Sequence, residues 1–228
     1  MEVEKISPNA AQNIQPVRTI ETDDPLAKPQ PGMALCLSGG GYRAMLFHLG
    51  ALWRLNEFGL LQGLVRVSSV SGGSVTAGML GLMWKRLQFD DKNTATNLEE
   101  LVINPIKQLA TFTIDQPSIL KGILLPWKTL GDEIAAAYRR HLFGNATLQD
   151  LPDDSEGPRF VIDATNVQTK VLWRFSKPFM GDYRVGLIRN PRLDLAIAVG
   201  ASSAFPPFLS PVVLKLKVIY RSSHTPHK

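Results

Sequence analysis

Two glycine-rich turns contain the residues of this sequence whose types and spacing could support chemistry. In the first turn, Ser38–Arg43, the consecutive glycines Gly39, Gly40 and Gly41 stand between an apolar run and a stretch of helical spacing. Glycine adopts positive φ readily and lets the backbone approach a ligand closely. Free N–H groups at the start of a helix favour negative charge. The turn could therefore hold a phosphate or a developing oxyanion, or it could be a tight connection without a ligand.

The second turn, Ser69–Gly73, places Ser71 between a strand-like run and a helix-like run. This arrangement is typical of a nucleophile elbow, in which a sharp turn lifts the serine hydroxyl out of the sheet beside backbone donors. The small residues Ser69, Gly72 and Gly73 suit such a crowded turn, although the usual pattern has glycine where Ser69 stands. Serine and glycine also cluster in ordinary turns, so this turn alone does not identify a nucleophile.

Alternating strands and helices must position these two turns. Apolar runs at 33–37 and 65–70 predict two buried strands, and apolar residues at helical spacing over 43–61 and 74–87 predict two helices. Successive strand–turn–helix units favour an α/β fold with a parallel sheet flanked by helices. The carboxyl ends of neighbouring parallel strands meet at one edge of the sheet, where ligands bind. A nucleophile on one turn beside oxyanion donors on the next would form an acyl-transfer site.

The rest of the chain continues this mixed pattern without an internal repeat. Thr129 and Asp132 resemble a capping box at the start of a helix, and Gly144 follows the end of that helix as a stop signal. Prolines between 206 and 211 predict an irregular segment. The remaining predicted elements are helices over 98–113, 130–143 and 193–199 and strands over 160–166 and 171–175, the two strands being joined by a turn near Gln168.

The composition indicates one folded domain. The chain has 228 residues, of which 44% are hydrophobic and 20% are charged, as in an ordinary globular protein. The formal net charge of +5 could favour anionic membrane surfaces. No dense Lys/Arg block and no basic stripe interleaved with aromatic residues occurs, so we expect no nucleic-acid partner. Histidines and acidic residues lack the spacing of metal ligands, and we expect neither a metal nor a cofactor.

Cysteine content and hydropathy favour a cytoplasmic protein. Cys36 is the single cysteine, so an intrachain disulfide cannot form, and its place in the apolar run 33–37 predicts a buried strand position. The N-terminus lacks the basic start and apolar centre of a secretory signal. The longest strongly apolar stretch, Val75–Trp84, is too short to span a bilayer. Peripheral membrane contact and the oligomeric state stay open.

At these residues the chain resembles the patatin-like phospholipase family. That family has a glycine-rich oxyanion turn with a following basic residue and, roughly thirty residues later, a serine elbow; Gly39–Arg43 and Ser69–Gly73 match in type, order and spacing. Gly200–Pro207 is similar to the Ala-Ser-Ser-Ala-x-Pro stretch of the family, and Phe160–Asn166 also looks familial. The resemblance covers about residues 33–213. It implies a three-layer fold with a mainly parallel central sheet flanked by helices, and a lipid or ester substrate.

The resemblance also implies a Ser–Asp dyad without the histidine of ordinary serine hydrolases. Ser71 would be the nucleophile of a phospholipase A-type or related carboxylic ester hydrolase. Backbone N–H groups of Gly39, Gly40 and Gly41 would stabilise the oxyanion, and Arg43 would help to order that turn. The aspartate would lie in an Asp-Gly-Gly or Asp-Gly-Ala motif shortly after the Pro-rich segment.

No Asp-Gly dipeptide occurs in the sequence, and the last acidic residue is Asp194. We therefore expect a truncated or frame-shifted gene product in which the C-terminal part of the fold is missing. In this interpretation 1–32 is an irregular, Pro-containing leader, 33–213 is an incomplete acyl hydrolase domain, and 214–228 is a basic tail unlike the family. The enzyme would be impaired, and the alternative is a catalytically inactive fragment.

Several other residues could replace the missing base, but each has a simpler structural interpretation. Asp163 and Asp194 fall in family-like segments, but each is expected to be a cap or surface residue. We interpret His48 as a packed or partly exposed helix residue and His141 as a cation at a helix end. Two more histidines lie in the basic tail, at 224 and 227.

Two rival folds fit parts of the sequence. Gly39, Gly41 and Ala44 fit the G-x-G-x-x-A pattern of a dinucleotide-binding protein, but the second strand ends at Ser71–Gly72 instead of an acid. The Gly-Lys-Ser/Thr of a P-loop is absent. A Ser-His-Asp α/β-hydrolase is the other rival, and the spacing from the glycine turn to the serine is shorter than that fold usually shows.

Overall fold

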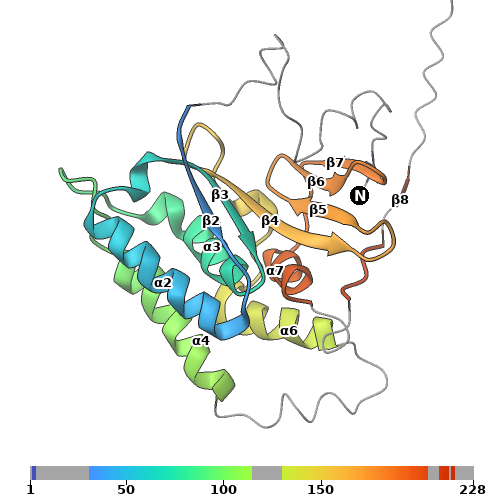
Figure 1. Cartoon of the computed structure of the whole chain (residues 1–228), viewed down its shortest axis with the longest axis horizontal. Coiled ribbons are helices and arrows are strands. Elements are labelled where there is room, and N and C mark those ends of the chain that lie inside the picture. Colours follow the sequence, from blue (N-terminus) through green and yellow to red (C-terminus); the bar gives the residue numbers. More distant parts are fainter. Residues whose placement is uncertain (1, 4–30, 115–129, 205–210, 216, 219–228) are drawn as a thin grey trace, which may run out of the picture.

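Six strands form one mixed sheet in a computed structural model that describes residues 2–3, 31–114, 130–204, 211–215 and 217–218. The sheet has the order β2-β3-β4-β5-β6-β7 (Figure 1). The first three strands are parallel, and the sheet continues with antiparallel pairs from β4 onward. The strands are β2 (Met33–Leu37), β3 (Leu64–Val70), β4 (Arg159–Asn166), β5 (Val171–Phe175), β6 (Phe179–Asp182) and β7 (Gly186–Arg189).

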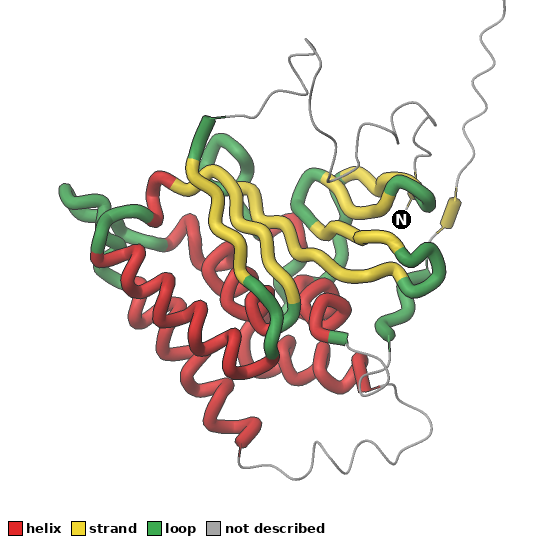
Figure 2. Tube along the Cα trace, viewed as in Figure 1, coloured by secondary structure: helices red, strands yellow, loops and turns green. Residues whose placement is uncertain are grey.

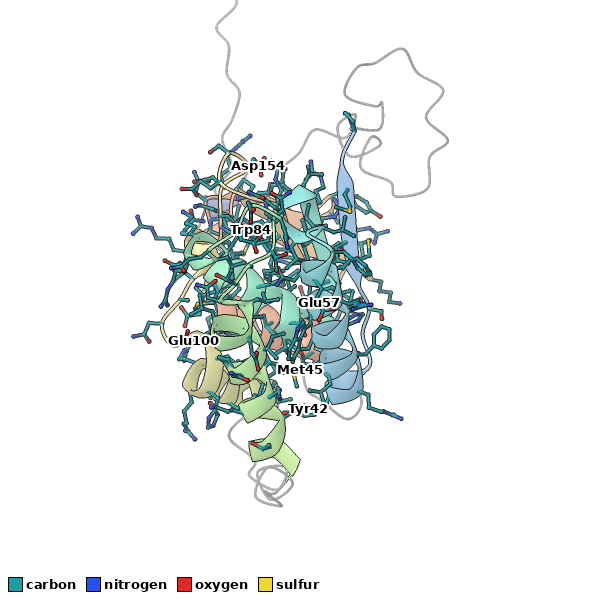
Figure 3. All side chains as sticks on the ribbon, turned by 90° about the vertical axis from the view of Figure 1, so that its left-hand side faces the viewer. Tyr42, Met45, Glu57, Trp84, Glu100 and Asp154 are labelled. Atoms are coloured by element: carbon teal, nitrogen blue, oxygen red, sulfur yellow. The ribbon has the colours of Figure 1, made fainter. Side chains whose placement is uncertain are left out.

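The described helices lie behind this sheet in the view of Figure 2 and on one side of β2 in Figure 3, so they cover one of its faces. Single turns of 3-10 helix occur at Leu61–Gly63, Trp84–Arg86 and Leu148–Asp150, and five-residue π-helices at Glu99–Ile103 and Arg139–Phe143. A two-stranded parallel pair joins β1 (Glu2–Val3) to β8 (Lys217–Val218). The α-helices are α2 (Gly41–Glu57), α3 (Gly72–Met83), α4 (Asn104–Ile114), α6 (Leu130–Tyr138) and α7 (Leu195–Ser203).

Helix α3 is the centre of the hydrophobic core. Every residue of Gly72–Gly81 is buried, because α3 packs on β3 and β4 on one side and on α2 and α7 on the others. The helix-facing side of the sheet is apolar at Leu37, Val67, Phe160 and Ile162. A helix that is buried all round needs small residues where neighbours come close, and α3 is rich in glycine accordingly.

The parallel register places both glycine-rich turns at the same edge of the sheet. Leu37, the last residue of β2, pairs with Ser69 near the end of β3, so Ser38–Gly40 and Ser71 follow side by side. Helices α2 and α3 then run back from this edge. Tyr42 at the start of α2 lies at one end of the molecule, and Trp84 just after α3 lies toward the other (Figure 3). The expected strand–turn–helix units are confirmed.

Cys36 is exposed, so the predicted buried position is wrong. Among the described residues, strand β2 is at the edge of the sheet with β3 as its one partner, and its residues alternate between the helix-covered face and the opposite face. Leu37 is buried on the helix side, whereas Cys36 points to the face that no described helix covers. An apolar run alone does not distinguish an edge strand from a central one.

The other sequence predictions differ in how well they agree with the structure. Gly144 ends the helical segment with φ 54°, as a stop signal should, and the Thr129–Asp132 capping box lies outside the described residues. The capping box that forms joins Thr147 and Asp150. Strands β6 and β7 were not predicted, because each has only four residues. The domain boundaries at 32 and 213 stay predictions, and no helix among the described residues is long and apolar enough to cross a membrane.

Candidate active site

Ser71 has a backbone conformation that few serines adopt. It lies between β3 and α3 with φ 54° and ψ −122°. A side chain with positive φ clashes with the backbone, and such a conformation costs about 1–3 kcal/mol, which the surrounding structure must offset. Strain of this kind is typical of the sharp strand-to-helix turn that presents a nucleophilic serine. No described group forms a hydrogen bond with the Ser71 hydroxyl.

The glycine turn packs directly on this elbow. Gly40 and Gly41 have φ of 139° and 61°, conformations that glycine adopts without strain. A Cβ atom added to Gly39 would lie 3.3 Å from Ser71 Cβ, and one added to Gly72 would lie 2.1 Å from the Gly41 carbonyl oxygen. The two backbones are therefore in contact, and side chains at these glycines would separate them.

The N-termini of two helices converge at this edge. Helix α2 begins at Gly41 and α3 at Gly72, and neither has a side-chain cap on its free N–H groups. Neither first turn contains an acidic residue that would neutralise the positive end of the helix dipole. Free N–H groups and two dipoles of the same sign favour a negative charge beside Ser71. This electrostatic environment suits a developing oxyanion.

Three serine hydroxyls connect the elbow to the surrounding elements. Ser202 of α7 accepts a hydrogen bond from the Ser71 N–H over 2.8 Å and donates one to the Asp163 carbonyl oxygen over 2.6 Å. Ser74 of α3 lies 2.9 Å from Ser202 Oγ and donates to Ser69 Oγ over 3.1 Å. Ser69, expected only to be small, therefore also belongs to a hydrogen-bond network that includes β3, β4, α3 and α7.

His48 holds the start of the glycine turn. It is 6% exposed on the inner face of α2, and its Nε2 lies 3.0 Å from the Ser38 carbonyl oxygen and 3.3 Å from Ser38 Oγ. The interpretation of His48 as a packed helix residue is confirmed, and its contact with Ser38 was not anticipated. Its spacing from Met45 and Leu52 places it on the buried face, but no sequence pattern identifies the backbone acceptor.

Arg43 does not contact the other predicted site residues through a hydrogen bond or an ion pair. It lies exposed on the first turn of α2, and no hydrogen bond or ion pair joins it to the described part of the chain. Gly73, by contrast, is buried behind the elbow, where an added Cβ would lie 2.5 Å from the Leu37 carbonyl oxygen. The structure thus brings Ser69, Gly72 and Gly73 together with the glycine turn.

The acidic candidates for a base form bonds elsewhere. Asp163 was expected to be a cap or surface residue, which is wrong: it is 8% exposed, and Ser68 Oγ donates to its Oδ2 over 2.7 Å. Burial raises the pKa of this carboxyl, against the opposing effects of the Ser68 hydrogen bond and the Arg174 charge. Asp194 occupies the N-cap position of α7 and forms an ion pair with Arg139, in line with the expectation.

The comparisons identify a relationship over most of the chain. Residues 35–220 match the family model described as patatin-like phospholipase. A search of curated proteins finds no significant match. The described residues contain no group of three or more His, Cys, Asp and Glu side chains that could hold a metal ion.

Solved structures are similar to this chain at low identity. Human GIVD cytosolic phospholipase A2 is 17% identical with a TM-score of 0.51, over 75% of this chain and 28% of that chain. ExoU of Pseudomonas aeruginosa, in its complex with SpcU, is 18% identical with a TM-score of 0.39, over 81% of this chain and 40% of that chain. VipD from Legionella pneumophila is 18% identical with a TM-score of 0.37, over 78% and 43%. This chain therefore spans less than half the length of each.

Proposed function

Since the chain belongs to the patatin-like phospholipase family, we propose that it is a phospholipase A-type lipid acyl hydrolase, or a related carboxylic ester hydrolase, with Ser71 as its nucleophile. The observation that carries this proposal is the strained conformation of Ser71, with φ 54°, directly against Gly39 of the neighbouring turn. Structural serines rarely need such a conformation, because it costs free energy without adding a contact.

The geometry supports an acyl-transfer reaction in two steps. Ser71 Oγ would attack the ester carbonyl carbon and lose its proton to a base, and the carbonyl oxygen would become an oxyanion. N–H groups at Gly39, Gly40, Gly41 and the start of α3 would stabilise that charge. The intermediate would collapse with release of the protonated alcohol, and water would then hydrolyse the acyl-enzyme.

None of the candidate bases is in position to take the proton of Ser71. Asp163 is bonded to Ser68, Asp194 to Arg139 and His48 to Ser38, so none of them contacts the Ser71 hydroxyl. A serine hydroxyl without a base is a poor nucleophile at neutral pH. We therefore propose that these 228 residues react slowly at Ser71, and that the dyad aspartate expected for the family is absent from them.

Membrane contact follows from the substrate. A phospholipid presents its ester at a bilayer surface, and the net charge of +5 would favour an anionic surface. We propose that the chain approaches the membrane peripherally, without an inserted helix. Arg43, exposed at the start of α2 beside the glycine turn, would be one of the cations that face the headgroups.

Hydrolysis of a short-chain p-nitrophenyl ester tests the proposal. The purified chain should hydrolyse the ester slowly, and Ser71→Ala should reduce the rate to that of buffer because the attacking oxygen is gone. Ser203→Ala, a change of another serine in the same region, is the matched control and should keep the wild-type rate. Equal rates for wild type and Ser71→Ala would reject Ser71 as the nucleophile.

A further inference from the structure

We propose that Ser202 is a positioning residue that fixes the backbone of Ser71 in its strained conformation. This inference rests on the proposed function, in which Ser71 is the nucleophile. Ser202 lies on α7, 131 residues along the chain from Ser71, and its side chain is 7% exposed. Among the described residues, Ser202 Oγ is the acceptor of the Ser71 N–H.

Two hydrogen bonds fix the Ser202 hydroxyl. A serine hydroxyl has one proton to donate and two lone pairs to accept with. The Asp163 carbonyl oxygen can only accept, so the Ser202 proton points to it over 2.6 Å. A lone pair then faces the Ser71 N–H at 2.8 Å, while Ser74 Oγ, whose own proton goes to Ser69, lies 2.9 Å away. Between the Ser71 N–H and the Asp163 carbonyl oxygen, Ser202 Oγ has one position and one orientation.

The residues around the Ser202 hydroxyl come from the elbow itself and from two elements beside it. Asp163 is in β4, beside β3; Ser74 is in the first turn of α3; and Ser71 joins β3 to α3. A rotation of the Ser71 peptide out of its strained conformation would break the bond to Ser202 and leave a buried acceptor without a partner. Buried polar groups without partners are unfavourable, so the network resists that rotation.

The role of Ser202 also determines which backbone N–H groups are free to stabilise the oxyanion. The Ser71 N–H points to Ser202, so it does not contribute to an oxyanion hole. The oxyanion donors are then the N–H groups of the glycine turn Gly39–Gly41 and of Gly72, on the free ends of α2 and α3. Ser202 thereby sets the position of Ser71 Oγ relative to those donors without touching the substrate.

The test compares Ser202→Ala with Ser203→Ala in two measurements. Ser203 is the neighbouring serine, and its hydroxyl lies 3.5 Å from the Tyr138 hydroxyl. The first measurement is the rate of Ser71 labelling by an alkyl fluorophosphonate at a series of concentrations. A misplaced nucleophile should lower the maximal labelling rate of Ser202→Ala by about tenfold or more without changing the half-saturating concentration. Ser203→Ala should match wild type, and Ser202→Thr, which keeps the hydroxyl, should restore most of the rate.

The second measurement, amide hydrogen exchange of Ser71, does not depend on catalysis. The Ser71 amide should be protected in wild type and in Ser203→Ala, and its protection should fall in Ser202→Ala while the core of α3 stays protected. The role of Ser202 would be overturned if the Ser71 amide were as protected in Ser202→Ala as in wild type. It would also be overturned if wild type were labelled and Ser202→Ala were labelled at the same rate. If wild type is not labelled but the Ser71 protection falls in Ser202→Ala, the positioning holds and the proposed function fails. If Ser202→Ala does not melt cooperatively, Ser202→Cys replaces it, because a thiol fills the site but bonds weakly.

Discussion

Ser71 combines a strained backbone with a hydroxyl that forms no hydrogen bond to the described part of the chain, and the residues that surround it are distant in sequence. Gly39 and Ser202 are brought to it by strand pairing and by the packing of α7. At this scale the sequence identifies which residue types could react, because Ser71 stands between a strand and glycines. It does not identify Ser202 or the contact of His48 with Ser38, since both depend on tertiary packing.

The raised pKa of Asp163 makes stability depend on pH in a defined direction. With the folded pKa above the ordinary 3.8, the native state keeps a proton that the unfolded state has lost, so the free energy of unfolding falls as pH rises through the folded pKa. Asp163→Asn removes this titration and keeps an oxygen that can accept from Ser68. Its melting temperature relative to wild type should rise as pH increases from about 4.

Thermal melts across the pH range check this expectation. Asp91→Asn, at an exposed position, serves as the control and should follow wild type at every pH. A difference between Asp163→Asn and wild type that stays constant, or falls with rising pH, would show that burial does not dominate at this carboxyl.

At the scale of elements, contact between the two turns requires glycine at specific positions. Gly73 and Gly50 both lie inside helices, where alanine is intrinsically favoured by about 1 kcal/mol. An alanine Cβ at Gly73 would lie 2.5 Å from the Leu37 carbonyl oxygen and 2.7 Å from that of Ser38, whereas at Gly50 it would meet nothing within 4 Å. Steric overlap should therefore decide the outcome at Gly73, and helix propensity at Gly50.

Chemical denaturation of the two alanine variants measures this difference. Gly73→Ala should lower the free energy of unfolding by about 1–3 kcal/mol, as overpacking does, and slow the reaction at Ser71. Gly50→Ala should raise it by about 1 kcal/mol. A Gly73→Ala variant as stable as Gly50→Ala would mean that the turns are not in contact.

Asp182 joins the two hairpins of the antiparallel half of the sheet. Its Oδ2 accepts from Asn166 Nδ2 at 2.8 Å and from Thr169 Oγ1 at 2.9 Å, and its Oδ1 accepts from the N–H groups of Arg184 and Val185. It is 4% exposed. Asp182→Ala would remove the buried carboxylate that accepts these four part-buried hydrogen bonds, and we expect a loss of about 3 kcal/mol in the free energy of unfolding.

Equilibrium unfolding in urea tests the role of Asp182. Asp91→Ala, an exposed aspartate on a turn, is the matched control and should change stability by less than about 0.5 kcal/mol. An Asp182→Ala variant that unfolds at the same urea concentration as Asp91→Ala would show that these bonds contribute nothing net.

The sequence predicts the strands with clear boundaries better than the shortest strands. Strands 33–37 and 171–175 coincide with β2 and β5, because their apolar runs are bounded by glycine, serine or charged residues. The antiparallel strands β6 and β7 have four residues each, too few for a periodic pattern, and Gly181 and Gly186 weaken the signal further. The exposure of Cys36 depends on strand order, which no local pattern encodes.

At the scale of the whole molecule, the parallel half of the sheet and the helices behind it form the part that holds the proposed site. Helices α2 and α3 both run back from one edge, so their free N-termini act on the same point. The antiparallel half, β5–β7, extends the sheet away from that edge (Figure 1). The match over residues 35–220 covers both halves, so the family assignment does not rest on the two turns alone.

The most direct test of Ser71 as nucleophile is covalent labelling with an alkyl fluorophosphonate, followed by mass-spectrometric mapping of the modified peptide. The reagent should modify Ser71 and no other serine, and Ser71→Ala should not be labelled although it melts like wild type. Labelling should be slow, because none of the candidate bases Asp163, Asp194 and His48 bonds to the hydroxyl. Folded wild-type protein that remains unlabelled at Ser71 after prolonged exposure, or that is labelled equally in Ser71→Ala, would contradict the account.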